Sequence, residues 1–242
     1  MTHFRLACAM ALGAGLAFAA PAHATLIVQV STASKTSTYT DGGAGDLAQA
    51  DVGTLIFSGS ADGWKFSGTA SSKPSLGAAL SPETDLNAQA TVPTGTKPLG
   101  ATRTITFRIT DTDFTLSGNA GGSSGIGGTT ATGTVKGVLA STATVGYTTY
   151  ADAGNKPFGT SSLLASATGL TGNPKSFGAD IDNLLKLGTV YSLTQVITIT
   201  QTGSGQTSFD ANLSLTPIPE PATLALLGSA LLGVGLVRRR RR

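Results

Sequence analysis

Hydrophobic and polar residues alternate with a period of two over much of the chain. This period places successive side chains on opposite faces of a β-strand. In the segment TRTITFRITD, Ile105, Phe107 and Ile109 are expected on one face, with threonines and Arg108 on the other. The same alternation predicts strands within residues 25–31, 53–60, 64–70, 132–151, 189–201 and 206–216.

Turn-forming residues separate these segments. Asp62-Gly63 lies between two predicted strands and is typical of a tight hairpin turn. Residues 202–205 (TGSG) predict a second hairpin that closes the sheet. Residues 71–100, which carry four prolines, and the glycine-rich residues 118–128 are expected to be loops. A single helix is predicted, over residues 179–187.

Regular strand and turn spacing with almost no helix predicts an all-β fold. We expect an antiparallel β-sandwich or jelly-roll-like body over residues 25–216. This predicted domain is called the body below. No fixed-period repeat is visible in it, which disfavours a solenoid.

The first 24 residues have the layout of a secretory signal peptide. Arg5 supplies a positive charge, residues 6–20 are apolar, and Ala22 and Ala24 form a small-x-small cleavage site. The apolar stretch is short for a transmembrane span. We therefore expect export by Sec-type machinery and cleavage after Ala24.

The last residues combine an apolar run with a basic end. Residues 222–237 carry no charge and as a helix would span about 24 Å, slightly less than a hydrocarbon core of about 30 Å. The positive-inside rule would keep the terminal arginines cytoplasmic: Arg238, Arg239, Arg240, Arg241 and Arg242. We expect a transmembrane helix, with a plain anchor as the alternative. A nucleic-acid patch is disfavoured because no aromatic residues interleave the arginines.

A short tag precedes the apolar run. Pro219 and Pro221 prevent helix formation there and would present Glu220 in an extended segment. Together with the apolar run and the arginines, this tag resembles the PEP-CTERM sorting signal of exported proteins in Gram-negative bacteria that make exopolysaccharide. The resemblance covers residues 219–242 and implies recognition and cleavage by an exosortase. It further implies transient anchoring in the inner membrane, followed by a place at the cell surface or outside the cell.

Composition restricts the chemistry of the body. The sequence holds two histidines, His3 and His23, and one cysteine, Cys8, all within the predicted signal peptide. The body therefore has no disulfide, no Cys or His nucleophile or base, and no zinc site built from His or Cys. It retains ten Lys and Arg against twelve Asp and Glu, so no nucleic-acid partner is expected. No cofactor is expected, and we do not expect an enzyme.

Several side chains remain as candidate sites. Asp111 and Asp113 could offer carboxylates to Ca²⁺, although a turn with carboxylate-to-amide hydrogen bonds is favoured. The segment DGGAGD (residues 41–46) is interpreted as a flexible loop instead of a calcium repeat. The glycines of residues 121–128 lack the lysine of a phosphate loop. Trp64, with Tyr147, Tyr150 or Tyr191, could stack on a sugar, but a core position is favoured for Trp64.

Threonines offer a further candidate surface. Thr104 and Thr106, and Thr198 and Thr200, are expected to align on one strand face. Such an array could bind ice or polysaccharide, although the solvent-facing side of a sheet is the simpler interpretation. The leading hypothesis is a structural protein of the cell surface or of an exopolysaccharide-rich biofilm matrix. The alternatives are a carbohydrate-, calcium- or ice-binding adhesion module and, remotely, a hydrolase that uses aspartates and Glu83.

Overall fold

Two antiparallel sheets make up the described part of the chain. The computed structural model describes residues 25–77, 82–115, 129–140, 142–171, 175–181 and 190–217. The predicted signal peptide, the glycine-rich residues 118–128 and the predicted tail from residue 218 lie outside these ranges. Within them no helix is long and apolar enough to cross a membrane.

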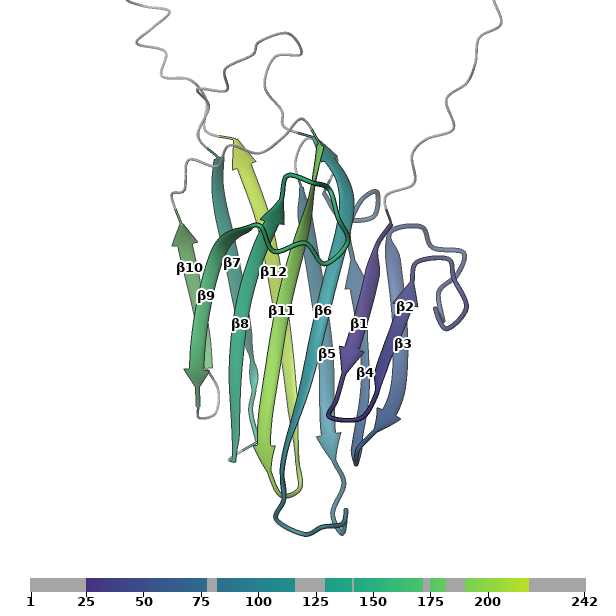
Figure 1. The fold of residues 1–242 in the computed structure, drawn as a ribbon, viewed down its shortest axis with the longest axis vertical. Coiled ribbons are helices and arrows are strands. Elements are labelled where there is room, and N and C mark those ends of the chain that lie inside the picture. Colours follow the sequence, from purple (N-terminus) through teal and green to yellow (C-terminus); the bar gives the residue numbers. More distant parts are fainter. Residues whose placement is uncertain are drawn as a thin grey trace, which may run out of the picture.

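Each sheet contains six strands. The first sheet, in front in Figure 1, has the order β2 (Thr36–Thr40), β1 (Ile27–Ser31), β6 (Thr102–Thr115), β11 (Val190–Thr202), β8 (Ala143–Asp152) and β9 (Ser162–Leu170). The second sheet has the order β10 (Lys175–Ile181), β7 (Thr129–Val138), β12 (Gly205–Pro217), β5 (Glu83–Val92), β4 (Trp64–Ser71) and β3 (Thr54–Ala61). The prediction of an all-β fold with two antiparallel sheets is confirmed.

The predicted turn at Asp62-Gly63 is also confirmed. It joins β3 to β4, whose register runs from Thr54 opposite Ser71 to Ala61 opposite Trp64. Asp62 and Gly63 have φ angles of 47° and 81°. Positive φ at both central residues is what a two-residue hairpin turn with the twist of its strands requires.

The predicted hairpin at residues 202–205 is wrong. The two strands that it joins, β11 and β12, lie in different sheets, β11 between β6 and β8 and β12 between β5 and β7. Both strands carry alternating apolar residues, and these face each other across the core. The short turn therefore connects the two sheets instead of two neighbours in one sheet.

Two other local predictions need correction. The proline-rich residues 71–100 contain β5, whose ten residues lie between Pro82 and Pro93 and form a central strand of the second sheet. The helix predicted over residues 179–187 is wrong for its first three residues, which end strand β10. Residues 182–187 lie outside the described ranges.

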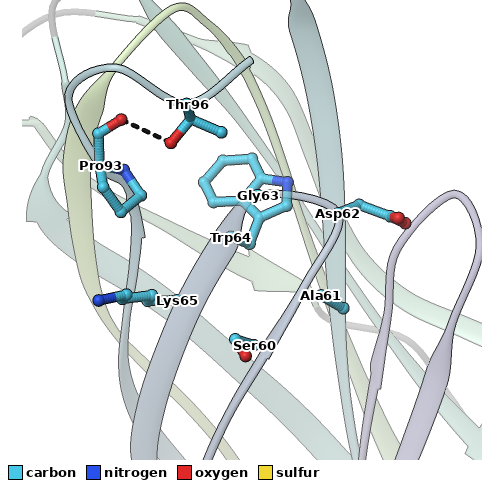
Figure 2. A pocket seen from close by; sticks show the side chains of 8 residues that line it. All are labelled: Ser60, Ala61, Asp62, Gly63, Trp64, Lys65, Pro93 and Thr96. Atoms are coloured by element: carbon cyan, nitrogen blue, oxygen red, sulfur yellow. Dashed lines mark hydrogen bonds between the residues drawn. The ribbon is translucent and has the colours of Figure 1, made fainter. Parts of the chain in front are cut away.

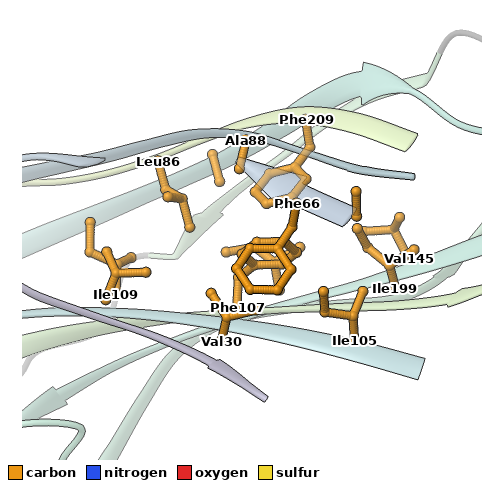
Figure 3. Packing of buried hydrophobic residues seen from close by; sticks show 14 of the residues in the cluster. Val30, Phe66, Leu86, Ala88, Ile105, Phe107, Ile109, Val145, Ile199 and Phe209 are labelled. Carbon is orange, nitrogen blue, oxygen red and sulfur yellow. The ribbon is translucent and has the colours of Figure 1, made fainter. Parts of the chain in front are cut away.

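The core is centred on Phe107 of β6. Its ring lies 5.3 Å from that of Phe209, 6.2 Å from Phe66 and 6.3 Å from Phe57, centroid to centroid. The three partners come from β12, β4 and β3 of the opposite sheet. Figure 3 shows Phe107 and Phe66 among the surrounding aliphatic side chains, and their two rings meet edge to face. Phe107 is fully buried. One aromatic side chain thus joins three strands of the facing sheet.

A polar connection crosses the core near its middle. Gln195 on β11 donates its amide to the carbonyl oxygen and to Oγ1 of Thr84 on β5, both at 2.8 Å. The hydroxyl of Tyr147 on β8 lies 3.0 Å from Gln195 Oε1 and 2.9 Å from the carbonyl oxygen of Asn212 on β12. These buried groups satisfy one another, so the connection links the sheets without leaving its polar atoms unpaired.

The central role of Phe107 predicts a large loss of stability for Phe107→Ala. Removing a fully buried aromatic ring and leaving a cavity costs about 3–5 kcal/mol. Thr104→Ala on the same strand is the matched control, because Thr104 faces solvent and the change removes only its cross-strand pair with Thr200, which is worth about 1 kcal/mol or less. Denaturant unfolding of both variants measures the difference. Equal losses would contradict the assigned centre of the core.

Candidate functional site

Asp111, one of the two calcium candidates, is buried and already neutralised. It is fully buried on β6, and its Oδ2 lies 3.4 Å from the Nζ of Lys73. Ser72 Oγ donates to the same oxygen at 2.5 Å, and the Thr112 amide donates to Oδ1 at 2.8 Å. Burial raises the pKa of Asp111, which the Lys73 charge opposes. The Asp111 carboxylate therefore links β6 to Ser72 and Lys73, and its side chain is not exposed to solvent.

Lys73 is held by three kinds of contact. Besides Asp111, its ammonium group donates to the carbonyl oxygen of Thr112 and lies 3.8 Å from the centre of the Phe114 ring. Burial lowers the pKa of Lys73, while the Asp111 charge raises it. A cation placed over an aromatic ring and beside a carboxylate is stabilised by both.

Asp113, the second calcium candidate, forms its hydrogen bonds mainly with Asn155. Asn155 Nδ2 donates to its Oδ1 at 2.7 Å, Thr112 Oγ1 donates to its Oδ2 at 3.0 Å, and its own amide donates to Asn155 Oδ1 at 2.9 Å. The two carboxylates therefore share Thr112 as a donor, through its amide and its hydroxyl, and otherwise contact different residues. Among the described residues, no three His, Cys, Asp or Glu side chains group as metal ligands would.

The segment DGGAGD folds around Asp46. This carboxylate is 4% exposed and accepts hydrogen bonds from the amides of Gly42, Ala48 and Ile56 at 2.8–3.0 Å. Ile56 belongs to β3, the outer strand of the second sheet, and the amide of Leu47 donates to its carbonyl oxygen at 2.8 Å. The loop thus covers an exposed sheet edge, a recurrent means of preventing strand pairing between molecules.

Three of the four aromatic candidates lie in the core, whereas Tyr150 on β8 is half-buried. Trp64, Tyr147 and Tyr191 are each 1% exposed, so the core position expected for Trp64 is confirmed. None of these three rings offers a face to a sugar in this structure.

The threonine pairs align as predicted. Thr104 lies opposite Thr200 and Thr106 opposite Thr198 across β6 and β11. Their hydroxyl oxygens are 3.1 Å and 3.3 Å apart, and Thr102 and Thr202 extend the row with a separation of 2.8 Å. The hydroxyls are hydrogen-bonded to each other across the strands, so part of their bonding capacity is used within the sheet.

Three acids gather on the outer face of the second sheet, which the sequence did not indicate. Glu83 and Asp85 lie two residues apart on β5, and Asp210 lies on the neighbouring β12. Asn212 donates to Glu83 Oε1 at 2.8 Å, and Lys136 lies 3.1 Å from Asp210 Oδ2. Burial, followed by the charges of Asp210 and Glu83, raises the pKa of Asp85 to about 7.

The predicted sorting residues lie outside the described ranges. These are Ala22 and Ala24 at the predicted cleavage site, the tag Pro219, Glu220 and Pro221, and the five arginines Arg238, Arg239, Arg240, Arg241 and Arg242. The structure does describe Pro217, which lies two residues before the tag. Strand β12 ends at Pro217, paired with Thr129 of β7, so the tail leaves directly from a central strand.

Comparison with known families identifies the tail. The model of the PEP-CTERM protein-sorting motif matches residues 217–242, which confirms the resemblance drawn from Pro219-Glu220-Pro221, the apolar run and the arginines. The motif supports an exported protein that is sorted by an exosortase. No curated protein and no solved structure matches the chain.

The two Lys–Asp pairs predict losses of stability of very different size for the same substitution. Lys73→Met leaves Asp111 buried without its cation, which costs about 3 kcal/mol or more. Lys136→Met removes a solvent-exposed pair, which is worth about 1 kcal/mol or less. Chemical denaturation at neutral pH checks both values. If the two variants lose equal stability, the buried pair does not have the role assigned to it.

The raised pKa of Asp85 predicts a stability that falls with pH. The folded value is about 7 and the unfolded value about 4, so the folded state holds an extra proton between them. Stability is therefore lost as pH rises from about 4 to 7. Asp85→Asn should raise the free energy of unfolding by about 1–2 kcal/mol at pH 8 and should not change it below pH 4. The value is kept small because Asp85 is partly exposed.

Thermal unfolding across this pH range provides the measurement. Asp51→Asn, which changes an exposed aspartate on a loop, is the matched control and should leave the pH dependence unchanged. An Asp85→Asn protein with the slope of the unmodified chain would contradict the assignment.

Proposed function

We propose that this chain is a non-enzymatic β-sandwich protein of the cell surface or extracellular matrix, delivered there through its carboxy-terminal sorting motif. The observation that carries the proposal is the match of that motif to residues 217–242, beginning at the last residue of β12. The sorting signal is thus appended to a folded body with no spacer domain between them.

Each part of the motif has a role that its chemistry suggests. Glu220 between two prolines serves as the recognition element for the exosortase, and residues 222–237 cross the inner membrane. The arginines Arg238–Arg242 keep the end of the chain in the cytoplasm. The signal peptide, cleaved after Ala24, supplies export by the Sec-type machinery.

The short segment between the body and the membrane-spanning residues limits how far the body of the precursor can lie from the membrane. From Pro217 to Ala222 the chain can extend at most about 17 Å. The end of the sandwich where β12 terminates would therefore stay close to the membrane until the tail is cut. Cleavage within the tag would release the body with its twelve described strands intact.

The body offers a durable scaffold for such a location. It contains no cysteine or histidine, so neither oxidation to disulfides nor histidine titration alters it outside the cell. Asp111, Asp113 and Asp46 are engaged in structural hydrogen bonds. These features favour a structural over a catalytic role.

Replacing Glu220 tests the proposal. Glu220→Gln removes the charge of the tag, and we expect the protein to stay in the membrane fraction with its tail intact. The unmodified protein should appear outside the inner membrane without Arg238–Arg242, as mass spectrometry of its carboxy-terminal peptide would show.

The other glutamate supplies the control for this experiment. Glu83→Gln changes the same residue type within the body and should be processed like the unmodified chain. Extracellular protein that retains Arg242 would contradict the proposal.

A further inference from the structure

The two ends of the sandwich differ in charge. Strand β12 ends and β1 begins at one end, the upper one in Figure 1, which we call the sorting end. The opposite or distal end is built from the turns at residues 32–35, 62–63, 93–101 and 203–204. Its turns contact one another: Ser34 donates to Asp62 through its amide at 2.7 Å, and the Gly203 amide donates to the Ala101 carbonyl oxygen at 3.1 Å.

Cations are concentrated at the distal end. Lys35, Lys65 and Lys97 are exposed there, and Arg103 is partly exposed. The single carboxylate among these turns, Asp62, is already engaged by the amide and hydroxyl of Ser34. Near the sorting end, Asp41, Asp46 and Asp51 lie in one loop, and Asp111, Asp113 and Asp152 lie in strands β6 and β8. The lysines there are Lys73, which is paired with Asp111, and the exposed Lys156. Among the described residues, the distal end therefore carries a surplus of positive charge and the sorting end a surplus of negative charge.

A pocket of about 340 Å³ opens among these cations. The β3–β4 turn and the loop after β5 form its walls, and Figure 2 shows the Trp64 ring between Pro93 and Thr96 on one side and the Asp62–Gly63 turn on the other. Lys65 lines the pocket, and Lys97 directly follows its lining residue Thr96. The indole Nε1 of Trp64 is buried and has no hydrogen-bond partner among the residues described.

The pocket walls are held in place by the chain itself. Thr96 Oγ1 donates to the Pro93 carbonyl oxygen at 2.7 Å, and Arg103 donates to the carbonyl oxygens of Pro98 and Ala101 at 3.0 and 3.2 Å. A Cβ at Gly63 would lie 2.5 Å from the Thr96 methyl group, so only glycine permits this approach. The loop that carries Lys97 is thus fixed against the turn that precedes Lys65.

We propose that this distal pocket and its lysines bind an acidic polysaccharide. The proposal rests on the proposed function, because it supplies the matrix component to which the exported body attaches. Lys65 and Lys97 attract the carboxylates of the sugar chain, and the pocket accommodates a sugar unit between them. The pocket is a shallow depression that opens broadly to solvent, so a sugar unit could enter it while the rest of the polysaccharide extends across the surface.

Two observations favour a polysaccharide over other partners. Single-stranded nucleic acids are bound by exposed aromatic rings on which bases stack, whereas Trp64 is 1% exposed. A neutral glycan would gain nothing from the surplus of positive charge.

The sorting end is tied to the tail, so the distal end is the part of the body that points away from the membrane before release.

The experiment uses the full-length chain in detergent, with Arg238–Arg242 replaced by Gln in every sample so that the tail cannot bind a polyanion. Alginate is the acidic probe, dextran the neutral probe and single-stranded DNA the competing polyanion. Retention is measured by affinity electrophoresis, and the fluorescence of Trp64, the chain's single tryptophan, reports binding at the pocket. Because binding is measured without processing, a negative result leaves the sorting proposal untouched.

We expect alginate to retain the protein and to shift Trp64 emission, with no effect of dextran. The double variant Lys65→Gln, Lys97→Gln should bind about tenfold more weakly, whereas Lys156→Gln at the sorting end should bind within about twofold of the unmodified chain. Equal weakening by Lys156→Gln, an unchanged Trp64 emission, or equally tight binding of DNA would each overturn the proposal.

Discussion

Burial of alternate side chains between two sheets is the constraint on which this structure depends. The body has no cysteine for a disulfide and, in its described part, no helix to cover a sheet face. Each strand must therefore direct one face inward, and Phe107 shows the result by contacting phenylalanines on three facing strands. The polar contacts that cross the core, from Gln195 to Thr84 and from Lys73 to Asp111, add specificity to this packing because each needs one relative position of the sheets.

The same constraint determines where functional groups can lie. Inward positions are filled by packing, and the outer strand β3 is covered by the loop around Asp46. The turns at the two ends remain free of these requirements, as loops on a rigid sandwich generally are. Because neighbouring strands are antiparallel, each end collects turns that are distant in sequence, and this brings Lys35, Lys65 and Lys97 to the end opposite the sorting motif.

The fold class and the tail were predictable from the sequence because both depend on local patterns. Alternation along residues 102–111 identified β6, and Asp62-Gly63 identified a turn. Strand β5 is not predictable from local patterns, because prolines such as Pro82 and Pro93 are typical of loops. In the structure they flank the strand and break no ladder within it. The turn at residues 202–205 looked like a hairpin because turn residues alone do not reveal which sheet each strand joins. Likewise, the meeting of Asp85 with Asp210 depends on the register between β5 and β12, which no local pattern specifies.

The threonine row and the basic end suggest different roles for polar surface on this body. Across β6 and β11, threonine hydroxyls lie opposite one another and bond mutually, so their first effect is to stabilise the central strand pair. The exposed lysines of the distal end have no such internal use. The loop beside the pocket is fixed by hydrogen bonds from the side chains of Thr96 and Arg103 to backbone carbonyl oxygens. A surface whose groups satisfy each other contributes mainly to the fold, whereas unpaired charge around a fixed pocket is available to a partner. If the exported protein is tethered through its carboxy-terminal motif, as we propose, recognition would lie at the end farthest from the tether.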